Sequence, residues 1–363
     1  MKIVFFTTYY EHYLKDFYRR APHFDQKSYA EQYQQLTDDY YGIFSSYAKY
    51  LNRGKAKAEM IICNCKPMQR TWAKENNVKF NEKNWRYAIS LAQIKAMKPD
   101  IFFMSSMFEY YGEFLEEVRK YVPNIFGWIS CPIPSGVRLN QMDLILTSLP
   151  TFVDDFRNVG VNAEFLTQAF DSELFSKLSK IQQRDIDFSF IGSFTKAHLN
   201  RIKAIQKLID KTPLKIFGTG INLIPDDRPL FQRLFSKSLA EKRYCGEAWG
   251  IEMFKALRRS KITFNSHIDI SDNYAGNIRM YEATGMGTLL LTDGEKSKGK
   301  IFSDQEVVYY KSIEDAIDKT NYFLSHEAER ESIATNGQQK TFKDYNYEKN
   351  SDLMYNYFLN YLN

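Results

Sequence analysis

The stretch NSHIDISDNYAGNIRMYEATGMGTLLLTD, from Asn265 to Asp293, decides the fold. An apolar run ends at Asn265, a polar loop follows, and Gly276-Asn277 opens a segment with helical spacing. The sequence GMG then ends that helix, and the apolar run LLLT begins another strand. Strand, loop, helix and strand in this order are typical of a parallel α/β sheet.

Arg279 and Glu282 lie three residues apart in this helix, so their side chains share one face. The helix N-terminus presents free backbone N–H groups and a partial positive charge, which suit a diphosphate. Arg279 could add charge-assisted hydrogen bonds to the same phosphates, and Glu282 could accept hydrogen bonds from ribose hydroxyls. The alternative is a surface ion pair without a ligand, but the flanking pattern favours the binding role.

Apolar runs alternate with helical segments on both sides of this stretch, which implies parallel sheets covered on both faces. We therefore predict an α/β fold with two Rossmann-like, doubly wound domains that face a central cleft. They occupy residues 1–170 and 171–345, and a helix at 346–363 packs back on the first domain. The predicted strands are 3–6, 59–63, 100–104, 124–129, 143–147, 162–167, 187–191, 214–217, 261–265, 288–292 and 307–310. The predicted helices include 30–51, 84–97, 198–211, 246–260, 277–285 and 348–362.

Composition narrows the class of protein. The 363 residues suit two domains. The net charge of +5 comes without a clustered Lys/Arg block, which argues against nucleic-acid binding and suits anionic substrates. The four cysteines have no zinc spacing, and no apolar run reaches the roughly 20 residues of a membrane helix. The chain is predicted to be cytoplasmic, or peripheral at the inner face of the membrane.

Residues Asn277 to Asp293 resemble the C-terminal domain of CgeB-like glycosyltransferases, part of the wider group-1 glycosyltransferases. The family pattern is roughly N-x-R-x-[FY]-E-A-x-[AG]-x-G-x-[LP]-L-[LV]-T-D, and the sequence matches it in register. Residues 187–205 and 142–161 resemble two further segments of the family. The resemblance implies the GT-B fold, an acceptor bound by the N-terminal domain at 1–170, and a nucleotide-sugar donor held mainly by the C-terminal domain at 171–345. It implies neither a metal nor a cofactor.

The resemblance assigns the ribose to Glu282 and the diphosphate to Arg279. It places two glycine turns near the donor phosphates and the base, although either can be an ordinary tight turn. His267 follows a strand and is predicted to contact the donor or to cap the loop, and Asn277 stands at the helix start. The predicted donor-binding residues are Gly192, Ser193, Gly218, Thr219, Gly220, His267, Asn277, Arg279 and Glu282.

Two departures from the pattern leave the stereochemistry open. Retaining group-1 enzymes often carry a second glutamate eight positions before the first, but Tyr274 stands there, and the nearest acids are Asp269 and Asp272. Many CgeB-like relatives have an acidic pair where this chain has Ser130-Cys131.

An inverting enzyme needs a general base on the N-terminal domain. His12 follows the first strand, Asp16 one turn later could orient it, and Glu109 lies beyond the strand at 100–104. Each could equally be an ordinary surface side chain. Arg279 is predicted to stabilise the leaving diphosphate, and no metal site is predicted.

The acceptor is predicted to be a glycan or a lipid-linked molecule in bacterial surface polysaccharide or glycoconjugate synthesis. This prediction rests on the usual role of the family that the sequence resembles. The aromatic and basic residues of segment 9–20 could hold a glycan or a lipid-linked diphosphate at the membrane surface, or could simply pack against the C-terminal helix. Two other functions stay open: a nucleotide-sugar epimerase, and a non-catalytic protein that binds sugar nucleotides or glycans.

Overall fold

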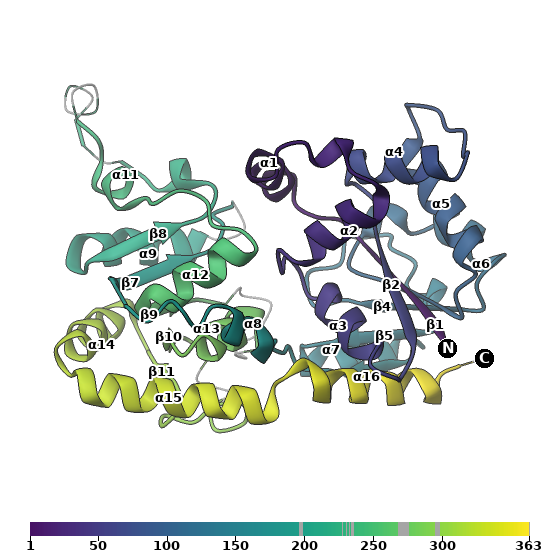
Figure 1. Cartoon of the computed structure of the whole chain (residues 1–363). Coiled ribbons are helices and arrows are strands. Elements are labelled where there is room, and N and C mark those ends of the chain that lie inside the picture. The colour runs from purple at the N-terminus through teal and green to yellow at the C-terminus, as the bar shows by residue number, and fades with distance from the viewer. Residues whose placement is uncertain are drawn as a thin grey trace. The chain divides into compact units, whose positions relative to one another are not determined.

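The computed structural model describes residues 1–195, 199–226, 228–229, 231, 233, 236–267, 276–294 and 298–362. The chain forms two compact units (Figure 1). Unit 1 is Met1–Thr167 with Tyr347–Asn363, and unit 2 is Gln168–Asn346. No helix in the described ranges is long and apolar enough to cross a membrane.

Unit 1 is built on a six-stranded parallel sheet with the order β2-β1-β3-β4-β5-β6. Its central strands are buried apart from Lys2 at the start of β1, because helices cover both faces and the strands are nearly continuous apolar runs. The strands are β1 (Lys2–Thr7), β2 (Lys57–Ile62), β3 (Ile101–Met104), β4 (Asn124–Trp128), β5 (Leu144–Thr147) and β6 (Ala163–Phe165).

The helices of unit 1 include α4 and α6, which the sequence analysis does not predict, and one predicted helix is divided. The single helix predicted at 30–51 is wrong: a turn separates α2 from α3, with positive φ at Tyr40 (55°) and Gly42 (78°). A helix cannot continue through backbone of that hand. The helices are α1 (Glu11–Arg20), α2 (Tyr29–Thr37), α3 (Phe44–Leu51), α4 (Lys66–Glu75), α5 (Trp85–Met97), α6 (Glu113–Arg119), α7 (Pro150–Asn158) and α16 (Tyr347–Asn360).

The C-terminal helix α16 is part of unit 1 and lies alongside α3 (Figure 1). Asn350 donates its side-chain amide to the carbonyl of Thr167 at 2.7 Å, and Tyr357 donates its hydroxyl to the carbonyl of Phe165 at 3.1 Å. The ring of Phe358 packs 5.3 Å from that of Phe126 in the sheet. Polar and apolar contacts thus fix this helix on the core of unit 1.

Unit 2 contains a five-stranded parallel sheet with the order β11-β10-β9-β7-β8. The strands are β7 (Ile186–Ile191), β8 (Leu214–Phe217), β9 (Ser260–Asn265), β10 (Leu289–Thr292) and β11 (Val308–Tyr309). The helices are α8 (Ser172–Lys177), α9 (Leu199–Lys211), α11 (Leu239–Arg243), α12 (Ile251–Arg259), α13 (Ile278–Gly285), α14 (Ile313–Ser325) and α15 (Glu327–Asp344).

The helix predicted to begin at Gly246 begins five residues later, at Ile251. Tyr244 forms an isolated parallel bridge to Ile216 of β8, and Gly218 donates its N–H to the carbonyl of Gly246 at 3.0 Å. This segment is therefore extended beside β8, and Gly250, with φ 52°, precedes the helix.

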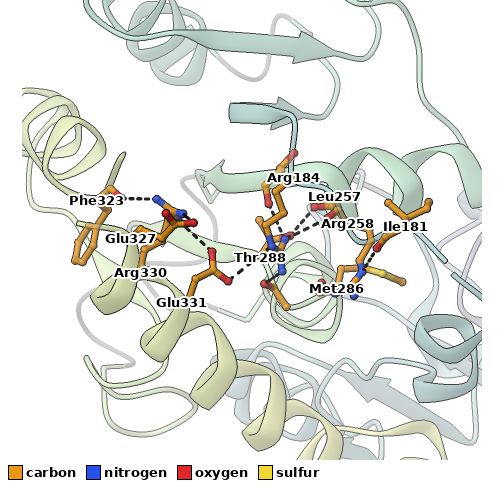
Figure 2. Close-up of polar contacts among 12 residues, drawn as sticks. Ile181, Arg184, Leu257, Arg258, Met286, Thr288, Phe323, Glu327, Arg330 and Glu331 are labelled. Atoms are coloured by element: carbon orange, nitrogen blue, oxygen red, sulfur yellow. Dashed lines mark hydrogen bonds and ion pairs between the residues drawn. The ribbon is translucent and has the colours of Figure 1, made fainter. Parts of the chain in front are cut away.

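The amino ends of the unit 2 strands are held by arginines (Figure 2). Arg184 donates Nη1 to the carbonyl of Ser260 at 2.8 Å and Nη2 to the carbonyl of Gly287. Arg258 donates Nε to the carbonyl of Ile181 at 3.0 Å. Arg330, only 2% exposed, donates Nη1 to the carbonyl of Phe323 at 2.9 Å. These bonds tie the segment before β7 to α12 and to the starts of β9 and β10, and they tie α15 to α14.

Candidate functional site

The predicted donor-binding residues lie at the carboxyl ends of the unit 2 strands and at the start of α13. Gly192 and Ser193 follow β7, Gly218 follows β8, and His267 lies two residues beyond β9. Parallel strands bring these turns to one edge of the sheet, where open α/β sheets bind ligands. Asp269, Asp272 and Tyr274 lie outside the described residues.

The turns after β7 and β8 approach each other backbone to backbone. Phe194 donates its N–H to the carbonyl of Thr219 at 2.9 Å. A β-carbon added to Gly218 would overlap the carbonyl of Gly192, and one added to Gly220 would overlap the carbonyl of Phe194. Both glycines also have positive φ. The close approach of the neighbouring turn is thus enough to require glycine at 218 and 220.

Gly220→Ala should destabilise the fold more than Gly299→Ala does. The two glycines have nearly the same φ, 79° and 78°, but a β-carbon at Gly299 would meet no atom within 4 Å. Gly299→Ala, the control, should therefore lower the free energy of unfolding only by the backbone strain, about 1 kcal/mol. Gly220→Ala should lower it by about 2 kcal/mol more, because its β-carbon overlaps the neighbouring turn. Urea unfolding measures both, and equal losses would contradict the close packing of the two turns.

Asn277, the N-cap residue of α13, binds the end of β9 rather than the helix. Its side-chain amide pairs with that of Asn265 through two hydrogen bonds of 3.0 and 3.1 Å. Asn265 also donates to the hydroxyl of Thr292 at 3.0 Å, at the end of β10. These bonds fix the start of α13 against two strand ends.

His267 bridges the same region through both ring nitrogens. Its Nδ1 lies 2.5 Å from Asp293 Oδ1, and its Nε2 accepts from the backbone N–H groups of Gly276 (3.2 Å) and Asn277 (3.4 Å). Because Nε2 accepts, Nδ1 is the ring nitrogen that can donate a proton to Asp293. The side chain is only 4% exposed. His267 therefore anchors the residues that open α13.

Arg279 and Glu282 form an ion pair on one face of α13. Arg279 Nη1 lies 2.8 Å from Glu282 Oε2 and 3.1 Å from the sulfur of Met253. The pair is largely shielded from water, since the side chains are 17% and 11% exposed. The exposed surface pair considered from the sequence is thus not what the structure contains.

Glu282 is a buried carboxylate with unused acceptor capacity. Burial raises its pKa, and Arg279 opposes the rise. Although Arg279 Nη1 is close to Oε2, no N–H of the described residues is aligned with that oxygen as a hydrogen-bond donor. A buried oxygen without a donor is costly, so a ligand hydroxyl that donates to it would be bound favourably.

Sequence reasoning missed Arg201, a cation on α9 at the same edge. It donates Nη2 to the carbonyl of Ser266 at 2.7 Å and Nη1 to the carbonyl of Ser193 at 3.3 Å. Burial lowers its pKa and the charge of Arg279 lowers it further, while Asp293 acts in the opposite direction. Arg201 and Arg279 therefore add positive charge to the same region, which suits an anionic ligand.

The three candidate catalytic residues of unit 1 lie near the ends of β1 and β3. His12 and Asp16 are on α1, and Glu109 is in the turn of 3-10 helix Phe108–Tyr110. Asp16, suggested as a partner of His12, accepts from Arg19 (2.6 Å) and Arg20 (2.7 Å). The structure thus places His12 and Glu109 near strand ends, and it adds two arginine partners to Asp16.

The aromatic residues of α1 mostly face inward. Tyr13 and Phe17 are buried, and Tyr13 stacks on Tyr41 with ring centroids 3.6 Å apart. Tyr10, just before α1, is 66% exposed. Tyr13 and Phe17 therefore pack inside unit 1, where their ring partners include Tyr41 and Phe24.

Comparisons with known proteins place the resemblance in the same region. Residues 197–356 match the family model described as glycosyl transferase-like. This match covers α9, β9, α13 and α15, the elements that form and support the candidate site. No curated protein matches the chain. The CgeB-like subfamily stays a prediction.

Several solved structures share the fold over their full length. Anabaena HepE, solved with UDP and glucose, has a TM-score of 0.57 at 10% identity, covering 99% of this chain and 100% of its own. Sucrose-phosphate synthase from Thermosynechococcus elongatus has a TM-score of 0.57 at 9% identity, covering 99% and 98%. AviGT4, a glycosyltransferase of avilamycin A biosynthesis, has a TM-score of 0.57 at 10% identity, covering 100% and 98%. With its two parallel α/β units, the chain has the GT-B fold of glycosyltransferases, as the sequence predicts.

Proposed function

We propose that the chain is a glycosyltransferase that moves a sugar from a nucleotide-diphosphate sugar to a glycan or lipid-linked acceptor. The observation that carries this proposal is the buried Glu282 beside Arg279 on α13, at the strand ends of unit 2. The similarity to HepE, whose structure contains UDP and glucose, supports the same ligand class.

The donor would bind with its diphosphate at the start of α13. Within the described residues, no acceptor bonds to the N–H groups of Ile278 and Arg279, in the first turn of the helix. His267 holds the two preceding N–H groups and so orients this terminus. The N-terminal partial charge and the guanidinium of Arg279 would stabilise the phosphates, with Arg201 adding positive charge nearby. Glu282 Oε2 would accept from a ribose hydroxyl.

Transfer forms a bond between an acceptor hydroxyl oxygen and the anomeric carbon, while the bond from that carbon to the diphosphate breaks. The leaving diphosphate keeps the electron pair, and the acceptor proton passes to a base, for which His12 and Glu109 are the candidates. Arg279 and the α13 terminus would stabilise the developing negative charge, so we propose that transfer needs no metal. Activity retained in EDTA would support this part of the proposal, and activity restored only by a divalent cation would overturn it.

We also propose a cytoplasmic location and a role in surface polysaccharide or glycoconjugate synthesis. Peripheral contact with the membrane would depend on whether the acceptor is lipid-linked. The four cysteines are free thiols. Free thiols suit a reducing compartment.

A thermal-shift screen with UDP, GDP, dTDP, CDP and CMP tests donor binding. One nucleoside diphosphate should raise the melting temperature of the wild type, because a ligand at 100 times its Kd adds about 2.7 kcal/mol. Glu282→Ala should lose this shift. Glu252→Ala is the matched control, since Glu252 forms an i,i+3 ion pair with Lys255 at the surface of α12. If no nucleotide shifts the wild type, or if both variants keep the shift, the donor site is misplaced.

A further inference from the structure

Hydroxyl groups line the carboxyl edge of the unit 1 sheet. Ser130, after β4, accepts from the backbone N–H of Ser148 at 2.8 Å and pairs with the hydroxyl of Thr147 at 3.2 Å. Ser148 also donates its hydroxyl to Ser130 at 3.1 Å. Ser106, after β3, donates to the carbonyl of Trp128 at 2.9 Å. Thr147 and Ser148 are buried, so the half-buried hydroxyls of Ser106 and Ser130 are the neutral polar groups that the ends of β3 and β4 present.

An exposed aromatic ring stands at the end of β1 on the same edge. Tyr10 is 66% exposed, and its ring lies 6.4 Å from that of Tyr41. Tyr41 in turn stacks on buried Tyr13. The backbone beside Tyr10 is fixed, because Asn64 exchanges two hydrogen bonds of 2.7 and 2.9 Å with the main chain of Tyr9. Tyr10 is thus an exposed ring on a rigid support.

The turns at this edge carry almost no charge. Segments 8–10, 105–109, 129–131 and 148–149 contain neither lysine nor arginine, and Glu109 is their one carboxylic acid. Arginines on neighbouring helices are paired: Arg20 binds Asp39 through two hydrogen bonds of 2.9 and 3.0 Å, and Arg86 lies 3.3 Å from Glu11. The corresponding edge of unit 2 instead carries Arg201 and Arg279.

We infer that the acceptor is an uncharged carbohydrate, and that the hydroxyl-lined edge of unit 1, with Tyr10, is the surface that binds it. The inference rests on the proposed function and narrows its acceptor to a glycan. A lipid-linked diphosphate needs charge-assisted hydrogen bonds from cations, which these turns lack. Sugar hydroxyls instead find neutral donors and acceptors, and the apolar face of a sugar ring can stack on Tyr10. Neighbouring strands lie about 4.8 Å apart, so the edge from β1 to β5 spans about 14 Å, enough for a short oligosaccharide.

The first test measures acceptor binding without a donor. Saturation-transfer NMR on the full chain would use neutral oligosaccharides, such as maltotriose and triacetylchitotriose, and a prenyl-diphosphate sugar in neutral lipid vesicles. Contact signals are expected from at least one neutral oligosaccharide. Tyr10→Ala should weaken this binding about 10-fold, and Tyr10→Phe, which keeps the ring, should not.

The second test uses the nucleotide sugar identified by the thermal-shift screen. Transfer to the neutral oligosaccharide should show KM raised about 10-fold in Tyr10→Ala, while the nucleotide shift stays at the wild-type value. Transfer to the lipid-linked diphosphate alone, or an unchanged KM in Tyr10→Ala, would overturn the inference and leave the proposed function standing. If no nucleotide raises the melting temperature of the wild type, the proposed function is contradicted, and the inference that rests on it is contradicted too.

Discussion

Arg279→Gln should lower the rate of sugar transfer at saturating donor by about 100-fold or more. The guanidinium lies one turn before Glu282, next to the N-terminus of α13, and is 17% exposed. Positive charge fixed in a site with little water stabilises a leaving diphosphate strongly, because it need not reorganise during the reaction. Steady-state kinetics with the identified donor would measure the loss in kcat.

Lys255→Gln is the matched control, because Lys255 forms an i,i+3 ion pair at 2.7 Å on neighbouring α12 but is 40% exposed. This control should keep its kcat. Equal rates for wild type and Arg279→Gln would show that Arg279 does not stabilise the leaving group.

Arg279→Gln should also lower the stability of the fold by an amount that depends on pH. Arg279 opposes the rise in the pKa of Glu282, so its loss should raise that pKa further. A carboxyl with a raised folded pKa stabilises the fold fully below its unfolded pKa, about 4.3, and loses that contribution as pH rises through the folded pKa. The melting temperature of Arg279→Gln should therefore fall further below that of the wild type between pH 4.5 and 7.5. The double variant Arg279→Gln/Glu282→Gln should remove this pH dependence, and a gap that stays constant with pH would contradict the coupling.

The strands could be predicted from sequence because parallel strands covered on both faces are continuous apolar runs. All eleven predicted strands overlap β1 to β11. The predicted helix boundaries are wrong where backbone conformation, rather than the apolar pattern, determines the secondary structure. The chain leaves the helical region at Tyr40 and Gly42, which splits the helix predicted at 30–51. Hydrogen bonding to β8 keeps residues 244–246 extended, which no local pattern reveals.

The contacts of the candidate site could also be predicted only in part. Arg279 and Glu282 could be paired from their spacing, since residues three apart on a helix are neighbours. The bonds from His267 to Asp293 and from Arg201 to Ser266 join residues 26 and 65 positions apart. Contacts of this kind depend on the order of strands in the sheet, and strand order is not readable from a single sequence without the fold.

The second large effect is expected far from the site, at Arg184. Arg184→Met should lower the free energy of unfolding by about 3 kcal/mol or more, measured by urea denaturation. Its side chain is 16% exposed, and its guanidinium donates to the carbonyls of Arg258, Ser260 and Gly287. Burial lowers the pKa of Arg184 to about 10. Removal of the guanidinium leaves these carbonyls at the amino end of the sheet without its donors.

Arg259→Met provides the control, because Arg259 pairs with Asp185, next to Arg184 in sequence, but both side chains are at least 40% exposed. An exposed ion pair contributes at most about 1 kcal/mol. The difference between the two variants therefore measures the buried hydrogen bonds, separately from the loss of one positive charge. If Arg184→Met and Arg259→Met lose equal stability, the carbonyls do not depend on Arg184. A selective loss in Arg184→Met with the nucleotide shift retained would show that this arginine supports unit 2 without acting in the donor site.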